Sequence, residues 1–283
     1  MPYGAVNEHM SKKSDSTTFI LSDIHHPFQD QSLLDAVEEC MRDAKPDCII
    51  LNGDIIDCHA ISRFVKAIDA TDLSFKHEID VTEAFIARLR KDHPKATIAY
   101  VEGNHEFRIK KLMTEPAQKE RWDWLQYYAM LPIILNFEKH KIVYADGGNI
   151  GEAKVQLGDV KIGHWGVARS KSGQTASSLI DRYGQKTVQG HTHHASIVYK
   201  RFGFGTVWGV ENPCMCEIND VEYCMDPNWF QGFTVLREHK NVMHPQLVVV
   251  EQSTRSFVFD GEVYEIKDKK TERKFKTLEI SAK

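Results

Sequence analysis

Three short apolar runs, separated by two amphipathic segments, form the pattern of the first hundred residues. The runs cover residues 17–21, 48–51 and 97–101, and their length and β-branched content are typical of buried strands. Between them, apolar residues recur at spacings of three and four over residues 33–41 and 75–93, which predicts a helix in each segment. The order strand, helix, strand, helix, strand indicates parallel strands joined by crossover helices.

A polar loop follows each of these three predicted strands. The loops contain Asp23-Ile24-His25, Gly53-Asp54 and Gly103-Asn104-His105. In open α/β sheets, ligands bind beyond the carboxyl ends of parallel strands. We therefore expect the three loops to converge at one edge of one sheet.

After residue 141 the pattern changes to short β-like runs. These runs cover residues 141–145, 160–162, 187–189, 197–201, 206–210, 233–237 and 247–250, with one helical segment at 174–183. A second sheet packed on the first is the economical arrangement. The sequence therefore predicts a mixed α/β fold, in which a two-layer β-sandwich is flanked by helices. An aromatic-rich segment, residues 121–130, is also predicted to be helical.

The domain organisation follows from the ends of this pattern. Residues 1–16 are a polar N-terminal segment, residues 17–266 are predicted to form a single domain, and residues 267–283 form a C-terminal tail with a basic stretch at 267–276.

Composition narrows the class of protein. The formal net charge of −4 provides no global positive field, which argues against a protein that coats DNA. The polar N-terminus lacks the apolar region of a secretory signal, and no run of about 18 apolar residues is present. We therefore expect a cytoplasmic protein without a membrane-spanning segment. Its oligomeric state is not determined by the sequence.

The six cysteines of the chain do not form the pattern of a disulfide scaffold, so we expect reduced thiols. Cys214, Cys216 and Cys224 could hold a structural zinc ion together with a fourth ligand. The absence of a Cys-x-x-Cys pair makes this the weaker interpretation.

Two further short segments carry histidines beside glycine, Gly163-His164 and Gly190-His191-Thr192-His193. In an extended strand, the rings of His191 and His193 would leave the same face. In a loop, they could instead diverge around two ions. Glycine before the pair permits a close approach of the backbone or a positive φ.

Together, the loops supply enough ligands for two metal ions. Two ions about 3.5–4 Å apart need a bridging carboxylate and further ligands on each side. Carboxylate, amide and imidazole groups suit Mn²⁺, Fe, Zn²⁺, Ni²⁺ and Co²⁺. The candidate metal ligands are Asp23, His25, Asp54, Asn104, His164, His191 and His193.

The five segments, in this order, resemble the motifs of the calcineurin-like metallophosphoesterase superfamily over about residues 20–193. The resemblance implies a bimetal site at the C-terminal edge of the strands and hydrolysis of a phosphate ester. It assigns Asp23, His25 and His193 to the first metal, Asp54 to the bridge, and Asn104, His164 and His191 to the second metal. Among these metals, we expect Mn²⁺ in preference to the others.

The resemblance also implies the catalytic roles. A hydroxide that bridges the metals would attack phosphorus, and His105 would donate a proton to the leaving alkoxide. Asp57 would orient the His105 ring and favour its charged form.

The chain departs from the protein serine/threonine phosphatase branch at one point. That branch has Asp-Arg-Gly where this chain has Asp57-Cys58-His59, so an arginine that clamps phosphate is missing. Arg63 or Arg108 could substitute for it, and His194 could touch the substrate. His26, His59 and His194 flank the motifs.

The missing arginine favours a phosphodiesterase, with a nucleic acid or a nucleotide as candidate substrate. Aromatic side chains within residues 122–128 and 208–230 could line the approach to the metals. The alternative is a phosphomonoesterase acting on a protein or a small molecule. A non-catalytic protein-binding scaffold is the least favoured function, because the ligand set and His105 are complete.

Overall fold

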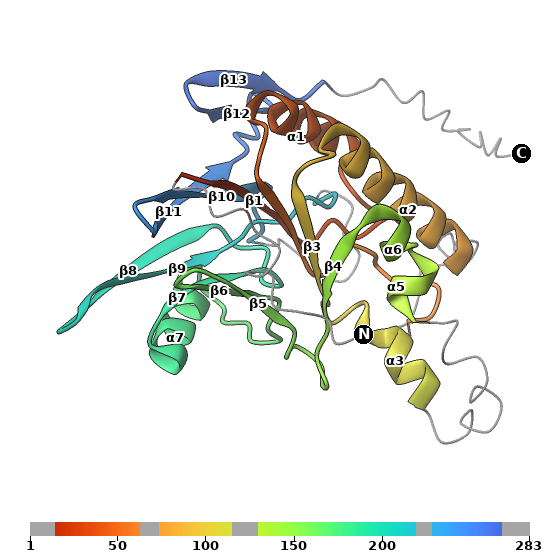
Figure 1. Cartoon of the computed structure of the whole chain (residues 1–283), viewed down its shortest axis with the longest axis horizontal. Coiled ribbons are helices and arrows are strands. Elements are labelled where there is room, and N and C mark those ends of the chain that lie inside the picture. The colour runs from red at the N-terminus through yellow and green to blue at the C-terminus, as the bar shows by residue number, and fades with distance from the viewer. Residues whose placement is uncertain (1–14, 63–73, 115–129, 219–227, 268–283) are drawn as a thin grey trace, which may run out of the picture.

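Two β-sheets packed against each other form the centre of the protein, and helices cover their outer faces (Figure 1). The structure is a computed structural model that describes residues 15–62, 74–114, 130–218 and 228–267. The strands are β1 (Thr17–Leu21), β2 (Cys48–Asn52), β3 (Thr97–Val101), β4 (Ile142–Ala145), β5 (Lys154–Leu157), β6 (Val160–Gly163), β7 (Lys186–Gln189), β8 (Ser196–Phe202), β9 (Gly205–Glu211), β10 (Gly232–His239), β11 (Val242–Val249), β12 (Ser256–Phe259) and β13 (Glu262–Glu265). The helices are α1 (Gln31–Ala44), α2 (Phe75–Asp92), α3 (Phe107–Thr114), α5 (Leu131–Ile134), α6 (Phe137–His140) and α7 (Gln174–Tyr183).

The first sheet has six strands in the order β11-β10-β1-β2-β3-β4. Strands β1 to β4 are parallel, whereas β10 is antiparallel to both of its neighbours. The predicted alternation of strands and helices over the first hundred residues is therefore confirmed. As a consequence, the loops that follow β1, β2 and β3 leave the same edge of the sheet.

Alternate residues of the central strands serve two different cores. Phe19 and Leu21 of β1 pack under α1 and α2, while Ile20 between them faces the second sheet. This separation follows from the two-residue period of a strand. Because both faces are covered, the whole of β2 is buried. In the sequence, the parallel strands are therefore continuous apolar runs and do not alternate between apolar and polar residues.

The second sheet has the order β5-β6-β7-β9-β8, and α7 packs on its outer face (Figure 1). Strands β6 and β7 are parallel, so their carboxyl ends also lie at one edge. The predicted two-layer arrangement flanked by helices is confirmed. Strand β5 and the hairpin β12–β13 were not predicted, and β11 begins at Val242 rather than at residue 247.

Several predictions lie outside the described residues. These are the N-terminal segment before residue 15, most of the aromatic segment 121–130, and the tail after Lys267. Within the described part of the chain, no helix is long and apolar enough to cross a membrane.

Candidate metal centre

Five loops at the carboxyl ends of β1, β2, β3, β6 and β7 bring the predicted ligands together. The loops after β1 and β2 continue beside each other, because the backbone N–H of Asp23 donates to the oxygen of Gly53 and that of His25 donates to the oxygen of Asp54. The ligands from the second sheet approach from the opposite layer. The centre therefore lies where the edges of the two sheets meet.

The side chains form two groups, in each of which the ligand atoms lie within 4.8 Å of one another. One group contains Asp23, His25 and His193, and the other contains Asp54, His164 and His191. His191 and His193 thus belong to different groups. Their backbone is a loop with φ of +75° and +55°, so the rings diverge as one of the two sequence interpretations predicted.

Left-handed backbone is concentrated at these positions. Asp23, His25 and Asp54 have φ of +54°, +55° and +51°, in addition to the two histidines after β7. For residues other than glycine, this conformation costs about 1–2 kcal/mol each. Strain of this kind persists where the surroundings hold it, and it is typical of functional sites.

Gly190 allows the close approach that the sequence suggested, although its own φ is not positive. A Cβ atom at this position would lie 2.7 Å from His164 Nδ1 and 2.9 Å from Asp23 Oδ2. Any larger residue would therefore displace two candidate ligands.

The orientation of His164 tests whether these residues suit a cation. Its Nδ1 donates to the backbone oxygen of Asn52 at 2.7 Å, so Nε2 carries the lone pair. This nitrogen is buried, has no hydrogen-bond partner among the described residues, and lies 3.1 Å from Asp54 Oδ2 and 3.7 Å from Asp23 Oδ1. Acceptors that face one another in this way require a positive charge between them.

Other candidate ligands also present acceptor atoms that call for a nearby positive charge. In the described part of the chain, His25 Nε2 and Asn104 Oδ1 are also buried acceptor atoms without a hydrogen-bond partner. Burial lowers the pKa of His164, but the carboxylates of Asp54 and Asp23 outweigh it and raise the pKa to about 10. The protein atoms alone thus attract a proton where a cation would bind. Carboxylate, amide and imidazole donors in this arrangement fit divalent metal ions.

Asp57 contacts two histidines rather than the one that was predicted. Its Oδ2 accepts from His25 Nδ1 at 2.8 Å and lies 3.2 Å from His105 Nδ1. Burial raises the pKa of Asp57, but the contacts with His105 and His25 hold it well below its ordinary range. Asp57 therefore fixes the ring of a candidate metal ligand as well as the ring of the candidate acid.

Arg108 lies directly beside His105. One of its nitrogens is 3.0 Å from His105 Nε2, and another donates to the backbone oxygen of Asp57 at 2.8 Å. Because arginine can only donate, His105 Nε2 accepts in this arrangement, and Nδ1 donates to the same Asp57 oxygen at 2.9 Å. Burial lowers the pKa of His105, but Asp54 and Asp57 outweigh it and raise the pKa.

The other two candidate substrate contacts differ from Arg108. Arg63 lies outside the described residues. His194 is 7% exposed, which leaves little of its surface for a substrate. Of the aromatic candidates, Trp208 is buried between the sheets, so it does not line the approach to the metal centre. The ring of Trp229, by contrast, lies 4.3 Å from that of His193.

A cavity of about 310 Å³ opens beside Asn104 and Arg108. Its wall combines apolar side chains with two cationic ones. The lining residues are Ile61, Ser62, Asn104, Phe107, Arg108, Lys111, Leu112 and Ile150.

Sequence reasoning gave no role to Glu106, although it stands in the Gly-Asn-His-Glu motif. Its buried carboxylate accepts from the backbone N–H groups of Asp54, Ile55 and Gly103, and from the hydroxyl of Tyr100. Glu106 therefore ties the loop after β2 to the loop after β3. Its position directly after His105 in this motif was the available signal.

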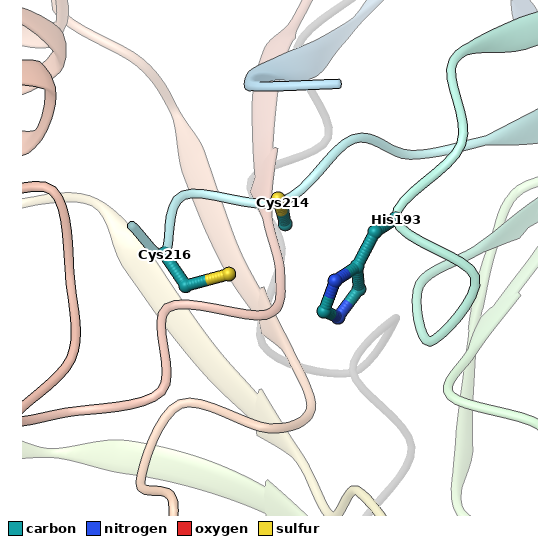
Figure 2. Close-up of side chains that lie close together, drawn as sticks. All are labelled: His193, Cys214 and Cys216. Carbon is teal, nitrogen blue, oxygen red and sulfur yellow. The ribbon is translucent and has the colours of Figure 1, made fainter. Parts of the chain in front are cut away.

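Cys214 and Cys216 lie beside His193, which sequence reasoning also missed (Figure 2). The proposed third cysteine, Cys224, lies outside the described residues. The structure instead joins two cysteines of the suggested cluster to a candidate ligand of the metal centre.

Comparison with known proteins gives one family match and several similar chains. A family model described as "Calcineurin-like phosphoesterase" matches residues 16–207. The Gene 54 protein of Mycobacterium phage D29 is 27% identical over 87% of this chain and 98% of its own length. Among solved structures, Vacuolar Protein Sorting 29 from Cryptosporidium parvum has 12% identity and a TM-score of 0.44, covering 89% of this chain and 95% of its own. Purple acid phosphatase PPD1 from yellow lupin has 12% identity and a TM-score of 0.47, covering 90% of this chain and 54% of its own.

We predict that Glu106→Gln destabilises the protein. In either orientation, the amide nitrogen would face at least two of the donors that the carboxylate accepts, and each buried donor left unpaired costs about 1–3 kcal/mol. The free energy of unfolding in urea, measured in the presence of a chelator, should fall by about 2–4 kcal/mol. Glu138→Gln, at an exposed position of α6, is the matched control and should be nearly neutral. Equal stabilities for the two variants would contradict the role given to Glu106.

Proposed function

This chain belongs to the calcineurin-like phosphoesterase family and is a metal-dependent phosphoesterase, and we propose that it cleaves phosphodiesters. The observation that supports metal-dependent chemistry at this site is the pair of ligand groups around Asp23 and Asp54, in which buried imidazole nitrogens face carboxylate oxygens. Such a pair of groups suits two adjacent cations.

In the proposed centre, Asp23, His25 and His193 would hold the first cation. Asn104, His164 and His191 would hold the second, and both would share Asp54. Mn²⁺ is the first candidate, and Fe, Zn²⁺, Ni²⁺ and Co²⁺ also suit the donor set. When bound, two divalent cations polarise the phosphoryl oxygens and lower the pKa of coordinated water. The two aspartates neutralise only half of the cationic charge, so the site attracts an anionic phosphate.

His105 is the proposed general acid. The hydrogen bond from Nδ1 to Asp57 fixes the ring and leaves Nε2, which lies 3.8 Å from Asp54 Oδ2, on the side of the metal centre. From there, the ring can transfer a proton to a leaving alkoxide.

Arg108 links substrate binding to this proton. While the guanidinium donates to His105 Nε2, that nitrogen has no room for a proton of its own. The phosphate of a substrate offers the guanidinium a better, charged acceptor. We therefore propose that Arg108 turns from His105 to the phosphate, which frees Nε2 to take up a proton from solvent and to pass it to the leaving alkoxide.

The preference for a diester rests on the cavity beside Asn104. Its apolar residues, among them Ile61, Phe107 and Leu112, can receive the second organic group that distinguishes a diester from a monoester. The charge of Arg108 is partly matched by Asp57 Oδ1 at 3.5 Å, so it can pair with the single charge of a diester but compensates the second charge of a monoester dianion only in part.

The alternative is a phosphomonoesterase, which is favoured by the two cations, Arg108 and Lys111, in the cavity wall. Among diesters, the net charge of −4 favours a nucleotide or a short nucleic acid over a long duplex. A cytoplasmic location remains our proposal and agrees with the free thiols of Cys40, Cys48 and Cys58.

We predict that Asp54→Ala loses most of both cations, because it removes the shared carboxylate. After dialysis against Mn²⁺-free buffer, elemental analysis should find two ions per wild-type chain and fewer than one per variant chain. Asp80→Ala, which removes an exposed carboxylate of α2, should keep both ions. Two tightly held ions in the Asp54 variant would refute the shared ligand.

We predict that His105→Ala keeps its metal ions but loses rate. For a diester with an alkyl leaving group, kcat should fall about 10²–10⁴-fold, which is the usual contribution of a general acid. The loss should shrink for nitrophenolate, which leaves without protonation. His77→Ala, at an exposed position of α2, provides the control. An unchanged kcat with the alkyl leaving group would remove His105 from the mechanism.

We predict that diester hydrolysis exceeds monoester hydrolysis. With equal Mn²⁺ loading, kcat/KM for bis-nitrophenyl phosphate should be higher than for nitrophenyl phosphate. The opposite order would establish the phosphomonoesterase instead. If diesters are preferred, the cleavage of oligonucleotides should then be measured at two salt concentrations. A steep loss of cleavage rate with salt indicates several phosphate contacts and therefore a nucleic acid rather than a nucleotide as substrate.

A further inference from the structure

The side chains of His193, Cys214 and Cys216 form a cluster that the phosphoesterase mechanism does not use. Their ligand atoms lie within 4.8 Å of one another, and all three residues are at most 5% exposed. Figure 2 shows both thiols on the same side of the His193 ring. A buried cluster of two thiols and one imidazole has the ligand types of a zinc site.

The backbone explains why both thiols point the same way. Cys214 and Cys216 form single bridges with Gln231 and Gln29, so the segment between them is extended. Residues i and i+2 of an extended segment share a face. Met215, between the two cysteines, points the other way into the main core, and its backbone N–H donates to the oxygen of Asp23 at 3.0 Å. The thiol pair is therefore anchored to the loop that carries a candidate metal ligand.

His193 presents its two nitrogens to different surroundings. Nε2 lies 3.1 Å from Asp23 Oδ1, on the side of the metal centre. Nδ1 is buried, and among the described residues the Cys214 thiol is the polar group close to it. That thiol also donates to the backbone oxygen of Phe230 at 3.4 Å. A buried imidazole nitrogen that faces two thiols offers a soft cation three ligands in one place.

We propose that His193 Nδ1, Cys214 Sγ and Cys216 Sγ form a site for Zn²⁺ that shares His193 with the phosphoesterase metal centre. The sharing of His193 between the two sites rests on the proposed function, whereas the thiol site itself does not. Zinc–sulfur and zinc–nitrogen bonds of about 2.3 and 2.0 Å place these tetrahedral ligand atoms about 3.5–3.8 Å apart. Small side-chain shifts from separations of at most 4.8 Å therefore bring three of the four ligands into place. On binding, each thiol releases its proton to solvent and coordinates as a thiolate.

The two sites differ in the cations that they select. Thiolates favour Zn²⁺ and Co²⁺ over Mn²⁺, whereas the carboxylates and the amide of the other centre suit Mn²⁺. Cations on both nitrogens of one ring repel each other and require that the ring lose both of its protons. Occupation of the thiol site therefore weakens the binding of a cation at His193 Nε2, and this coupling is reciprocal.

Cobalt titration of the reduced full-length chain tests the site without reference to hydrolysis. Co²⁺ bound by thiolates has an intense sulfur-to-cobalt charge-transfer band in the near ultraviolet. We expect this band in the wild type and in a Cys40→Ala/Cys48→Ala control, which removes two buried cysteines elsewhere. It should be lost in Cys214→Ala/Cys216→Ala and weakened by either single substitution. Absence of the band from the wild type, or its persistence in the double variant, would overturn the proposal.

A second titration tests the sharing of His193. With Mn²⁺ at a concentration that fills the metal centre, the Co²⁺ concentration at half-maximal band intensity should rise at least tenfold. An unchanged midpoint would overturn the sharing. Two Mn²⁺ ions per chain and normal diester hydrolysis in Cys214→Ala/Cys216→Ala would establish that this variant is folded. The same result with no wild-type band would refute the zinc site alone and leave the proposed function standing.

Discussion

The concentration of buried acceptor atoms between the two sheets is the constraint on which the centre depends. Asp23 and Asp54 are almost fully buried, and the Nε2 atom of His164 faces both of them and has no hydrogen-bond partner in the part of the chain that the structure describes. In an apolar interior, such an arrangement is unfavourable unless positive charge lies within it. The demand for cations is therefore a property of the folded chain itself.

The surrounding structure holds the ligands in place at the cost of backbone strain. Left-handed conformations recur at Asp23, His25 and Asp54, and the buried carboxylate of Glu106 accepts hydrogen bonds from the loops after β2 and β3. Rigid parallel strands below these loops supply the frame. The stability of the sandwich thus maintains a geometry that the loops would not adopt alone.

Two residues connect parts of the centre that have different proposed tasks. Asp57 contacts His25 and His105, so it relates a candidate metal ligand to the candidate acid. His193 lies between Asp23 and the thiols of Cys214 and Cys216. Such shared residues mean that a change at one site has consequences at its neighbour.

The sequence by itself determined the class of fold and the identity of the candidate ligands. Apolar runs, helical spacing and polar residues at strand ends are local patterns, and they located β1, β2, β3, α1 and α2 and the motifs between them. Only the tertiary structure decided which side chains meet. The opposite directions of His191 and His193, the second partner of Asp57 and the approach of Cys214 to His193 depend on loop conformation and on contacts between the sheets. These contacts join residues far apart in the chain, and no local pattern encodes them.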